Sequence, residues 1–373
     1  MEPGVGNPGA QEGHSPGALG PPFRDRVGGL ADPASTGHAH TIRAAARVNG
    51  VSAMIDVLFT VDVEIWCERW DSLDEQFPDA FKRYVYGPTR SGDHALPLKL
   101  AMLRDYGLRG VFFPEALFAT RFGTGALQEL VGLLQAGGQE IQLHLHTEWV
   151  DEARPAIFDS QKGKRQFMRD FTLPEQTQLL EIGLSLLRNA GATNICAFRA
   201  GSFGMGRDTI TAVGKVGLRF DTSYNQSLIT PTQNPLPNGY LLQPTRFGDV
   251  IEYPASVIRN GSSLRHLQLG ACSFEEMKAA LWEAHDAGWQ SIVILGHNFD
   301  LMNQAKNGPD RVLVRRFRKL CEFLDRYRGT FRTTWFNELD DRVADHQPEV
   351  LAVGGYPRAV RQAEQAWRRL RYR

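Results

Sequence analysis

Residues 58–66 read LFTVDVEIW, an apolar run that ends in two acids, Asp62 and Glu64. Polar groups follow three later apolar runs in the same way: His144 and His146 in EIQLHLHTEW (140–149), Arg199 in FRAGSFG (198–204), and His297 in VILGHNFD (293–300). An α/β scaffold presents residues from several strand ends to one pocket in this manner. Carboxylates with imidazoles suit a divalent metal such as Zn²⁺, which keeps one position open for a reactive water. The pattern predicts a metal-dependent hydrolase.

A helical stretch that ends at glycine and leads into a short apolar strand recurs five times: RDYGLRGVFF (104–113), LQAGGQEIQLHL (134–145), RNAGATNICAF (188–198), GKVGLRFDTS (214–223) and HDAGWQSIVIL (285–295). Glycine is favoured there because the residue after a helix usually takes the left-handed conformation. Such a repeat predicts an α/β fold built as a parallel βα array. We expect strands near 56–61, 110–113, 140–145, 195–199, 218–221, 250–253, 291–296 and 330–333.

Seven or eight parallel strands favour a barrel. A doubly wound open sheet is the second choice, because no glycine-rich phosphate loop follows the first strand. Two helix starts have the capping-box pattern of a hydroxyl residue with glutamate three positions later, at Thr172 and Glu175 and at Ser273 and Glu276.

Composition limits the class of protein. The chain has 373 residues, 42% of them hydrophobic, which is enough for a full-sized core. Its 42 basic and 42 acidic residues balance, so no overall charge favours nucleic acid or an anionic membrane. No apolar run suits a membrane span or a signal peptide. The four cysteines form no CxxC pair. We expect a cytoplasmic protein.

Three regions are expected. Residues 1–53 are rich in Gly, Pro and Ala without periodicity, which indicates a disordered leader, and Met54 is a candidate natural start. Residues 54–337 contain the predicted strands and form the expected barrel domain. Residues 338–373 are polar and turn basic in WRRLRYR, which favours a tail or a solvated helix.

Across residues 55–335 these segments resemble the polysaccharide deacetylase family, also known as NodB-homology domains or family 4 carbohydrate esterases. The resemblance implies an irregular (β/α) barrel of about seven strands, a divalent metal and five motifs in fixed order. The first motif, Thr-Phe-Asp-Asp, is similar to Thr60-Val-Asp-Val-Glu64. It implies that Asp62 is the catalytic base and Glu64 a metal ligand. Acids two apart on a strand face the same way, so the two roles could be exchanged.

The second motif places two histidines four residues apart after an apolar strand, and this implies His144 as a metal ligand. Position 148 is Glu148 here, and an additional imidazole stands at His146. Glu148 fits the motif position, whereas His146 would share a face with His144 on a straight strand. We favour Glu148 slightly, since a carboxylate can replace imidazole as a zinc ligand.

The remaining motifs supply the acid–base groups. The third, an Arg-Pro turn, resembles Phe198–Gly204 with alanine in place of proline, and implies that Arg199 holds the base carboxylate. The fourth is similar to Phe220–Tyr224, where Asp221 either orients the catalytic histidine or caps a turn. The fifth, Leu-x-His, matches Leu295-Gly-His297 and implies that His297 is the general acid.

The resemblance therefore implies a hydrolase that removes an N-acetyl group from an amino sugar or glycan precursor. Zn²⁺ is the expected metal, with Co²⁺ or Mn²⁺ as alternatives, and the expected partner is a carbohydrate or another small molecule. Two alternatives stay open. One is a metal-dependent amidohydrolase that acts on a non-sugar C–N bond, and the other is an inactive glycan-binding homologue.

Overall fold

The computed structural model describes residues 54–158, 163–229 and 240–372, and the predicted leader lies outside these described residues. The central strand is β1 (Ile55–Val63), whose nine residues are all buried. One edge of β1 pairs in parallel with β13 (Ser291–His297), and the other pairs with β14 (Phe331–Thr333) and β4 (Val111–Pro114). A strand buried on both faces needs a continuous apolar sequence, which explains why this stretch stands out in the chain.

The strands form two five-stranded sheets. The first has the order β13-β1-β4-β5, with β14 also on β1, and the second has the order β6-β7-β8-β10-β9. A parallel bridge between Glu115 and His144 connects the two sheets. The remaining bounds are β5 (Glu140–Ile141), β6 (Leu143–Leu145), β7 (Ala197–Ala200), β8 (Phe220–Asp221), β9 (Thr245–Phe247) and β10 (Val250–Glu252). Within the two sheets, only β9 with β10 pairs antiparallel among the described residues.

The prediction of a mixed α/β fold with parallel strands is confirmed, and every predicted strand range overlaps an observed strand. Closure of the sheets into a barrel stays a prediction. Two short antiparallel pairs were not predicted, β2 (Pro88–Thr89) with β3 (Gly92–Asp93) and β11 (Val257–Asn260) with β12 (Ser263–His266).

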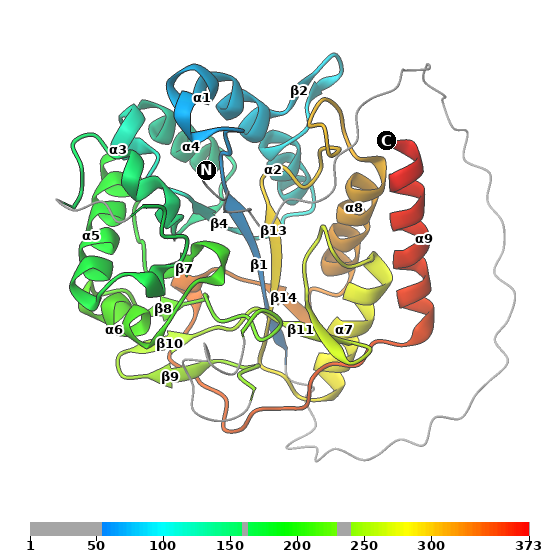
Figure 1. The fold of residues 1–373 in the computed structure, drawn as a ribbon. Helices are drawn as coiled ribbons and strands as arrows, with labels where there is room; N and C mark the ends of the chain where they lie inside the picture. Colours follow the sequence, from blue (N-terminus) through cyan, green and yellow to red (C-terminus); the bar gives the residue numbers. More distant parts are fainter. Residues whose placement is uncertain (1–53, 159–162, 230–239, 373) are drawn as a thin grey trace, which may run out of the picture.

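Helices surround the strands (Figure 1). Their bounds are α1 (Leu73–Phe81), α2 (Leu96–Asp105), α3 (Ala119–Phe122), α4 (Gly125–Ala136), α5 (Leu173–Asn189), α6 (Arg207–Lys215), α7 (Phe274–Asp286), α8 (Arg311–Arg326) and α9 (Gly355–Arg371). The two predicted capping boxes begin α5 and α7. A glycine with positive φ lies two residues beyond the end of each of α2, α4, α5, α6 and α7, as the helix–glycine–strand repeat predicts.

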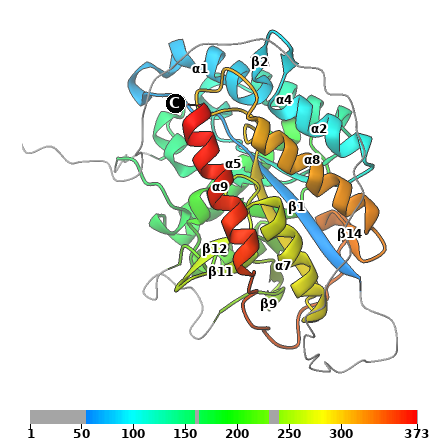
Figure 2. The ribbon, with the colours of Figure 1, turned by 90° about the vertical axis from the view of Figure 1, so that its right-hand side faces the viewer.

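The C-terminal region forms α9, which runs beside α7 and α8 (Figure 2). Ion pairs join α9 to the body: Arg361 to Glu276, Glu364 to Arg316, and Arg368 to Asp310. None of the described helices is both long enough and apolar enough to cross a membrane. The cytoplasmic location itself stays a prediction.

Candidate active site

The carboxyl end of β1 carries the first two site residues. Asp62 is the last residue of β1 that pairs with β13, and its partner there is His297. Glu64 follows the strand, where the side chain of Asn298 accepts a hydrogen bond from its backbone N–H at 3.0 Å and donates one to its carbonyl at 3.1 Å. Asn298 therefore ties the ends of β1 and β13 together. One possible metal-binding atom from each of Asp62, Glu64 and His297 lies within 4.8 Å of the other two.

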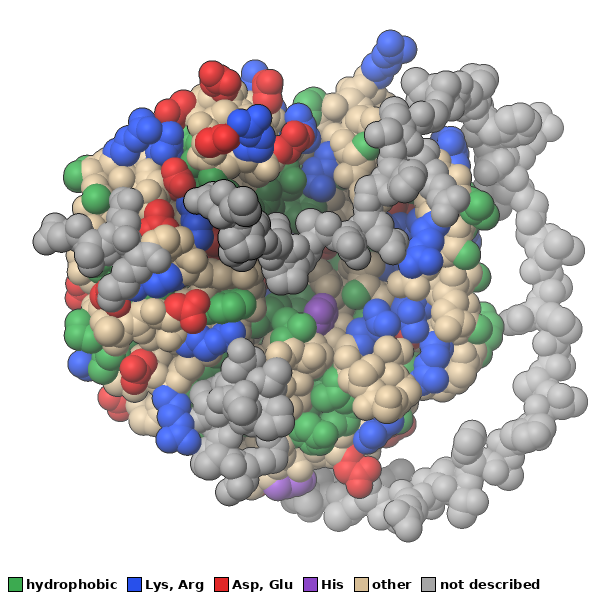
Figure 3. Space-filling view, in the orientation of Figure 1, with side chains coloured by type: hydrophobic (Ala, Val, Ile, Leu, Met, Phe, Trp, Pro, Cys, Tyr) green, Lys and Arg blue, Asp and Glu red, His purple; other side chains and the backbone are tan. Residues whose placement is uncertain are grey.

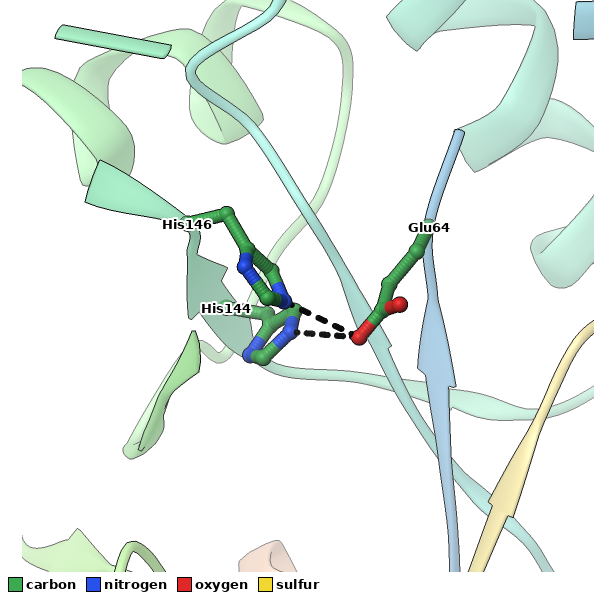
Figure 4. Close-up of side chains that lie close together, drawn as sticks. All are labelled: Glu64, His144 and His146. Atoms are coloured by element: carbon green, nitrogen blue, oxygen red, sulfur yellow. Dashed lines mark hydrogen bonds and ion pairs between the residues drawn. The ribbon is translucent and has the colours of Figure 1, made fainter. Parts of the chain in front are cut away.

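Two imidazoles face Glu64 from β6 and the residue after it (Figure 4). Nε2 of His144 lies 3.3 Å from Oε1 of Glu64, and Nε2 of His146 lies 3.0 Å from the same oxygen. All three residues are buried, and their nearest donor atoms lie within 4.8 Å of one another. Two nitrogen donors and one oxygen donor at this spacing are a set that a single divalent ion can share.

The outer nitrogen of each imidazole has its own partner. Nδ1 of His144 donates to the carbonyl oxygen of Arg199 at 2.8 Å, and Nδ1 of His146 lies 3.3 Å from Oε2 of Glu148. A proton on Nδ1 leaves the Nε2 lone pair free, which is the tautomer that a metal ligand requires. The donor set therefore fits a metal such as Zn²⁺. The structure places His146 against Glu64, whereas Glu148 lies behind His146.

Electrostatics agree with a cation at this position. Burial alone would raise the pKa of Glu64, but the charges and hydrogen bonds of His146, His297 and His144 lower it well below its ordinary value. Burial would likewise lower the pKa of His146, but Glu64 and Glu148 raise it well above 6.5. The buried carboxylate thus attracts positive charge, which an imidazolium supplies here and a metal ion supplies more strongly.

Asp62 is held by a buried arginine. Nη1 of Arg199 donates to Oδ1 of Asp62 at 2.7 Å. The rest of the guanidinium donates to the carbonyl and hydroxyl of Thr222, each at 3.2 Å, and stacks over Phe113. The side chain of Arg199 is fully buried, so its charge is satisfied by Asp62 and by Thr222. In the part of the chain that the structure describes, Oδ2 of Asp62 has no hydrogen-bond partner and is left for a reacting group.

His297 lies across the site. Its Nε2 is 3.9 Å from Oε1 of Glu64, and its side chain is 27% exposed. Its Nδ1 lies 3.2 Å from the amide of Gln268 and 3.7 Å from Oδ1 of Asp300. Lys99 donates to the carbonyl of His297 at 2.6 Å. Burial would lower the pKa of His297, but Glu64, Asp300 and Asp62 raise it to about 9.

Asp221 takes a different position from these residues. Its Oδ1 accepts a hydrogen bond from the hydroxyl of Ser223 at 2.7 Å, and its carboxyl lies beside that of Glu252. The ring of His297 instead faces Gln268 and Asp300. Neither Gln268 nor Asp300 is predicted from the sequence. Asp300 had a usable signal, because it ends the VILGHNFD stretch three residues after His297.

The surroundings of the site are aromatic. Trp66 donates from Nε1 to Oε2 of Glu64 at 2.7 Å, and its ring meets that of His146 edge-on. Phe299 stacks on the ring of His297 with 5.2 Å between ring centroids. Figure 3 shows the molecule hollowed near its centre in this view, with a histidine side chain visible among hydrophobic ones. The arrangement combines a metal-type donor set, a held carboxylate and a partly exposed imidazole at the carboxyl ends of β1, β6 and β13.

No protein-family model matches this sequence, and no curated protein compared with it matches either. Similar solved structures do exist. A protein assigned to the polysaccharide deacetylases, from Mycobacterium smegmatis, is 16% identical with a TM-score of 0.44, over 87% of this chain and 94% of that one. A family 4 carbohydrate esterase from Streptomyces lividans, in complex with acetate, is 11% identical with a TM-score of 0.37, over 76% and 92%.

A family 4 pseudoenzyme from Bacillus anthracis is 10% identical with a TM-score of 0.40, over 82% of this chain and 72% of that one. These are distant similarities, and the chemical argument depends on the side chains of this chain. The names of these solved structures are those of the family that the sequence motifs resemble.

Proposed function

We propose that this chain is a metal-dependent hydrolase that removes an N-acetyl group from an amino sugar or glycan precursor. The observation that carries the proposal is the convergence of Nε2 of His144, Nε2 of His146 and Oε1 of Glu64, with both Nδ1 atoms already bonded outward. Two imidazoles and a carboxylate favour Zn²⁺, with Co²⁺ or Mn²⁺ as alternatives. We also propose the barrel closure and the cytoplasmic location that the sequence predicts.

In this proposal, Glu64, His144 and His146 hold the ion, and Glu148 orients His146 from behind. If a divalent ion is bound there, it would supply polarisation of the acetamide carbonyl and a lowered pKa of water. The contacts of Glu64 with both imidazoles favour it as the ligand and Asp62 as the base. Glu148, which we favoured from its motif position, is the less suitable third ligand because His146 lies between it and Glu64.

Asp62 and His297 have separate roles in the proposed reaction. Asp62, oriented by Arg199, accepts the proton of the attacking water at its free oxygen, and the new C–O bond forms at the acetyl carbon. His297 donates the proton on its Nε2 to the amide nitrogen, because an amine leaves poorly without that proton. The C–N bond breaks, acetate departs, and the sugar keeps a free amine. Base and acid come from β1 and β13, the two paired strands.

The experiment is acetate release by the purified chain, stripped of metal and then supplied with Zn²⁺, Co²⁺ or Mn²⁺. Suitable substrates are N-acetylhexosamine nucleotides, lipid-linked analogues and oligomers. We expect metal-dependent release that His144→Ala abolishes together with metal binding. The matched control is His346→Ala, which changes an exposed histidine. Stoichiometric metal without release from any of these substrates would favour a non-sugar C–N bond, and absence of metal binding would favour an inactive homologue.

A further inference from the structure

A chain of polar side chains leads from His297 away from Glu64. One atom of the Gln268 amide lies 3.2 Å from Nδ1 of His297, and the other lies 2.8 Å from Nε2 of His266. Nδ1 of His266 lies 3.1 Å from the hydroxyl of Ser227, which lies 2.7 Å from Oδ1 of Asn225. Five side chains are thus connected end to end, and only His297 lies next to the proposed metal ligands.

The backbone holds Gln268 beside β13. Gln268 forms a parallel bridge with Leu295, two residues before His297. The N–H of Leu269 donates to the carbonyl of Leu295, and the N–H of Leu295 donates to the carbonyl of Leu267, both at 2.9 Å. His266 ends β12 directly before this segment. The amide is therefore presented to His297 by ladder hydrogen bonds and not by a free loop.

The far end of the chain fixes the direction of its hydrogen bonds. The backbone N–H of Ser227 donates to Oδ1 of Asn225 at 3.1 Å, so this atom is the amide oxygen, which can only accept. The Ser227 hydroxyl lies 2.7 Å from the same oxygen and must give it its single proton. The hydroxyl oxygen can then only accept from His266, which places a proton on Nδ1 of His266.

The side-chain amide of Gln268 carries the same donor-to-acceptor order on to His297. Burial lowers the pKa of His266, which favours the neutral ring, so Nε2 of His266 accepts. Gln268 must therefore present its NH₂ to His266 and its oxygen to His297. In the structure the amide nitrogen is drawn toward His297, and a half-turn of the amide exchanges the two ends. With the amide oxygen facing His297, Nδ1 of His297 donates a hydrogen bond to Gln268. The nearby carboxylate of Asp300 also favours a proton on Nδ1.

We propose that Gln268 is a positioning residue for His297. Together with His266 and Ser227 it forms a hydrogen-bond relay, anchored at Asn225, that keeps a proton on Nδ1 of His297 and leaves Nε2 to exchange the catalytic proton. The catalytic part of this inference rests on the proposed function, in which His297 gives the Nε2 proton to the leaving amine. After that transfer the ring is neutral and keeps its Nδ1–H on Gln268.

The direct test is ¹⁵N NMR of the zinc-loaded chain labelled at histidine, with the pH raised until both rings are neutral. Signals are assigned with His266→Phe and His297→Phe. We expect protonated Nδ1 and bare Nε2 in both rings. Protonated Nε2 in both rings would mean the opposite direction and would overturn the relay. This result does not depend on any substrate, so it stands apart from the proposed function.

The second test is kinetic. Gln268→Met removes the acceptor, and we expect kcat to fall about 10-fold while KM and zinc content stay unchanged, because the ring loses its orientation and not its charge. Gln268→Glu keeps an acceptor at His297 and should restore most of kcat. The matched control is Gln347→Met, which removes an amide that bonds the backbone of Leu242 and Gln243. Unchanged kcat in Gln268→Met would contradict the positioning role.

Discussion

The histidines on the two sides of the site differ in how exposed they are and in which atom each Nδ1 contacts. On the ligand side, the side chains of His144 and His146 are 1% and 4% exposed, and each Nδ1 meets a carbonyl or carboxylate oxygen. On the acid side, the side chain of His297 is 27% exposed, and its Nδ1 meets an amide and a more distant carboxylate. A ligand must keep a bare lone pair in a dry site, whereas a proton donor must reach substrate and exchange protons. Burial and the outer partner therefore separate the two roles.

The largest expected effect tests the ligand side. His146→Ala should weaken zinc affinity by more than about 100-fold, because it removes a proposed ligand. Glu148→Gln should weaken it by about 10-fold, because it changes only the outer partner of His146. Zinc affinity is measured by competition with a chromophoric chelator.

The zinc affinities of the two variants are compared under conditions where both have the same unfolding free energy. The exposed His346→Ala is the control. The reverse ranking, with Glu148→Gln the more damaging, would return Glu148 to the ligand position favoured from the motif.

The next effect tests the acid side. His297→Ala should keep its zinc and lose about 10² to 10⁴ in kcat, since its proposed role is proton delivery to the leaving amine. Metal content and acetate release are measured on the same preparation. Loss of zinc equal to that in His144→Ala would place His297 among the ligands and remove the distinction between the two sides.

The sequence predicted the parts of this comparison that follow apolar strands. Asp62, Glu64, His144 and His297 could be proposed as site residues because a strand buried on both faces has a continuous apolar sequence, which makes a polar residue at its end easy to recognise. The strand positions were predictable for the same reason. The sequence could not decide between His146 and Glu148, because that depends on where the chain turns, and the turn begins at Thr147.

The residues that contact His297 from other parts of the chain could not be predicted from the sequence. Gln268 follows the β11–β12 hairpin and reaches His297 only through pairing with β13. Asp221 and Asp300 both stand close after apolar runs, and the sequence left open whether Asp221 orients the catalytic histidine or caps a turn. The direction of each side chain decides between them, and Asp221 bonds to Ser223. The contact of Lys99 with His297 could not be predicted from the sequence, since Lys99 lies inside α2 and not at the end of a strand.

A smaller effect is expected at Arg199, which contacts both the proposed ligand His144 and the proposed base Asp62. The carbonyl of Arg199 accepts from His144, and its guanidinium holds Asp62. Arg199→Met keeps that carbonyl but leaves a buried carboxylate unpaired, which should cost about 3 to 5 kcal/mol of unfolding free energy. Urea denaturation measures the loss, with Arg188→Met, a change at an exposed position of α5, as control. A loss below about 1 kcal/mol would show that water or another cation compensates Asp62.

The smallest effect compares two buried glutamates. Imidazoles lower the pKa of Glu64, whereas burial and the adjacent carboxylate of Asp221 raise the pKa of Glu252 well above its ordinary 4.5. Glu252 therefore holds a proton in the folded state that the unfolded chain releases above pH 4.5. Its contribution to stability is complete below that pH and is lost as the pH rises toward the folded pKa.

Glu252→Gln should make the unfolding free energy less dependent on pH above 4.5, because an amide cannot lose a proton there. The amide can still donate to Asp221 and accept from the N–H of Tyr224, as Glu252 does at 3.0 Å. Urea unfolding is measured from pH 5 to 8 without metal, with Glu349→Gln at an exposed site as control. The difference in slope should be at most about 1.4 kcal/mol per pH unit, the value for one proton. Parallel curves would mean that Glu252 is ionised in the folded chain, so that Arg199 compensates two carboxylates as well as Asp62.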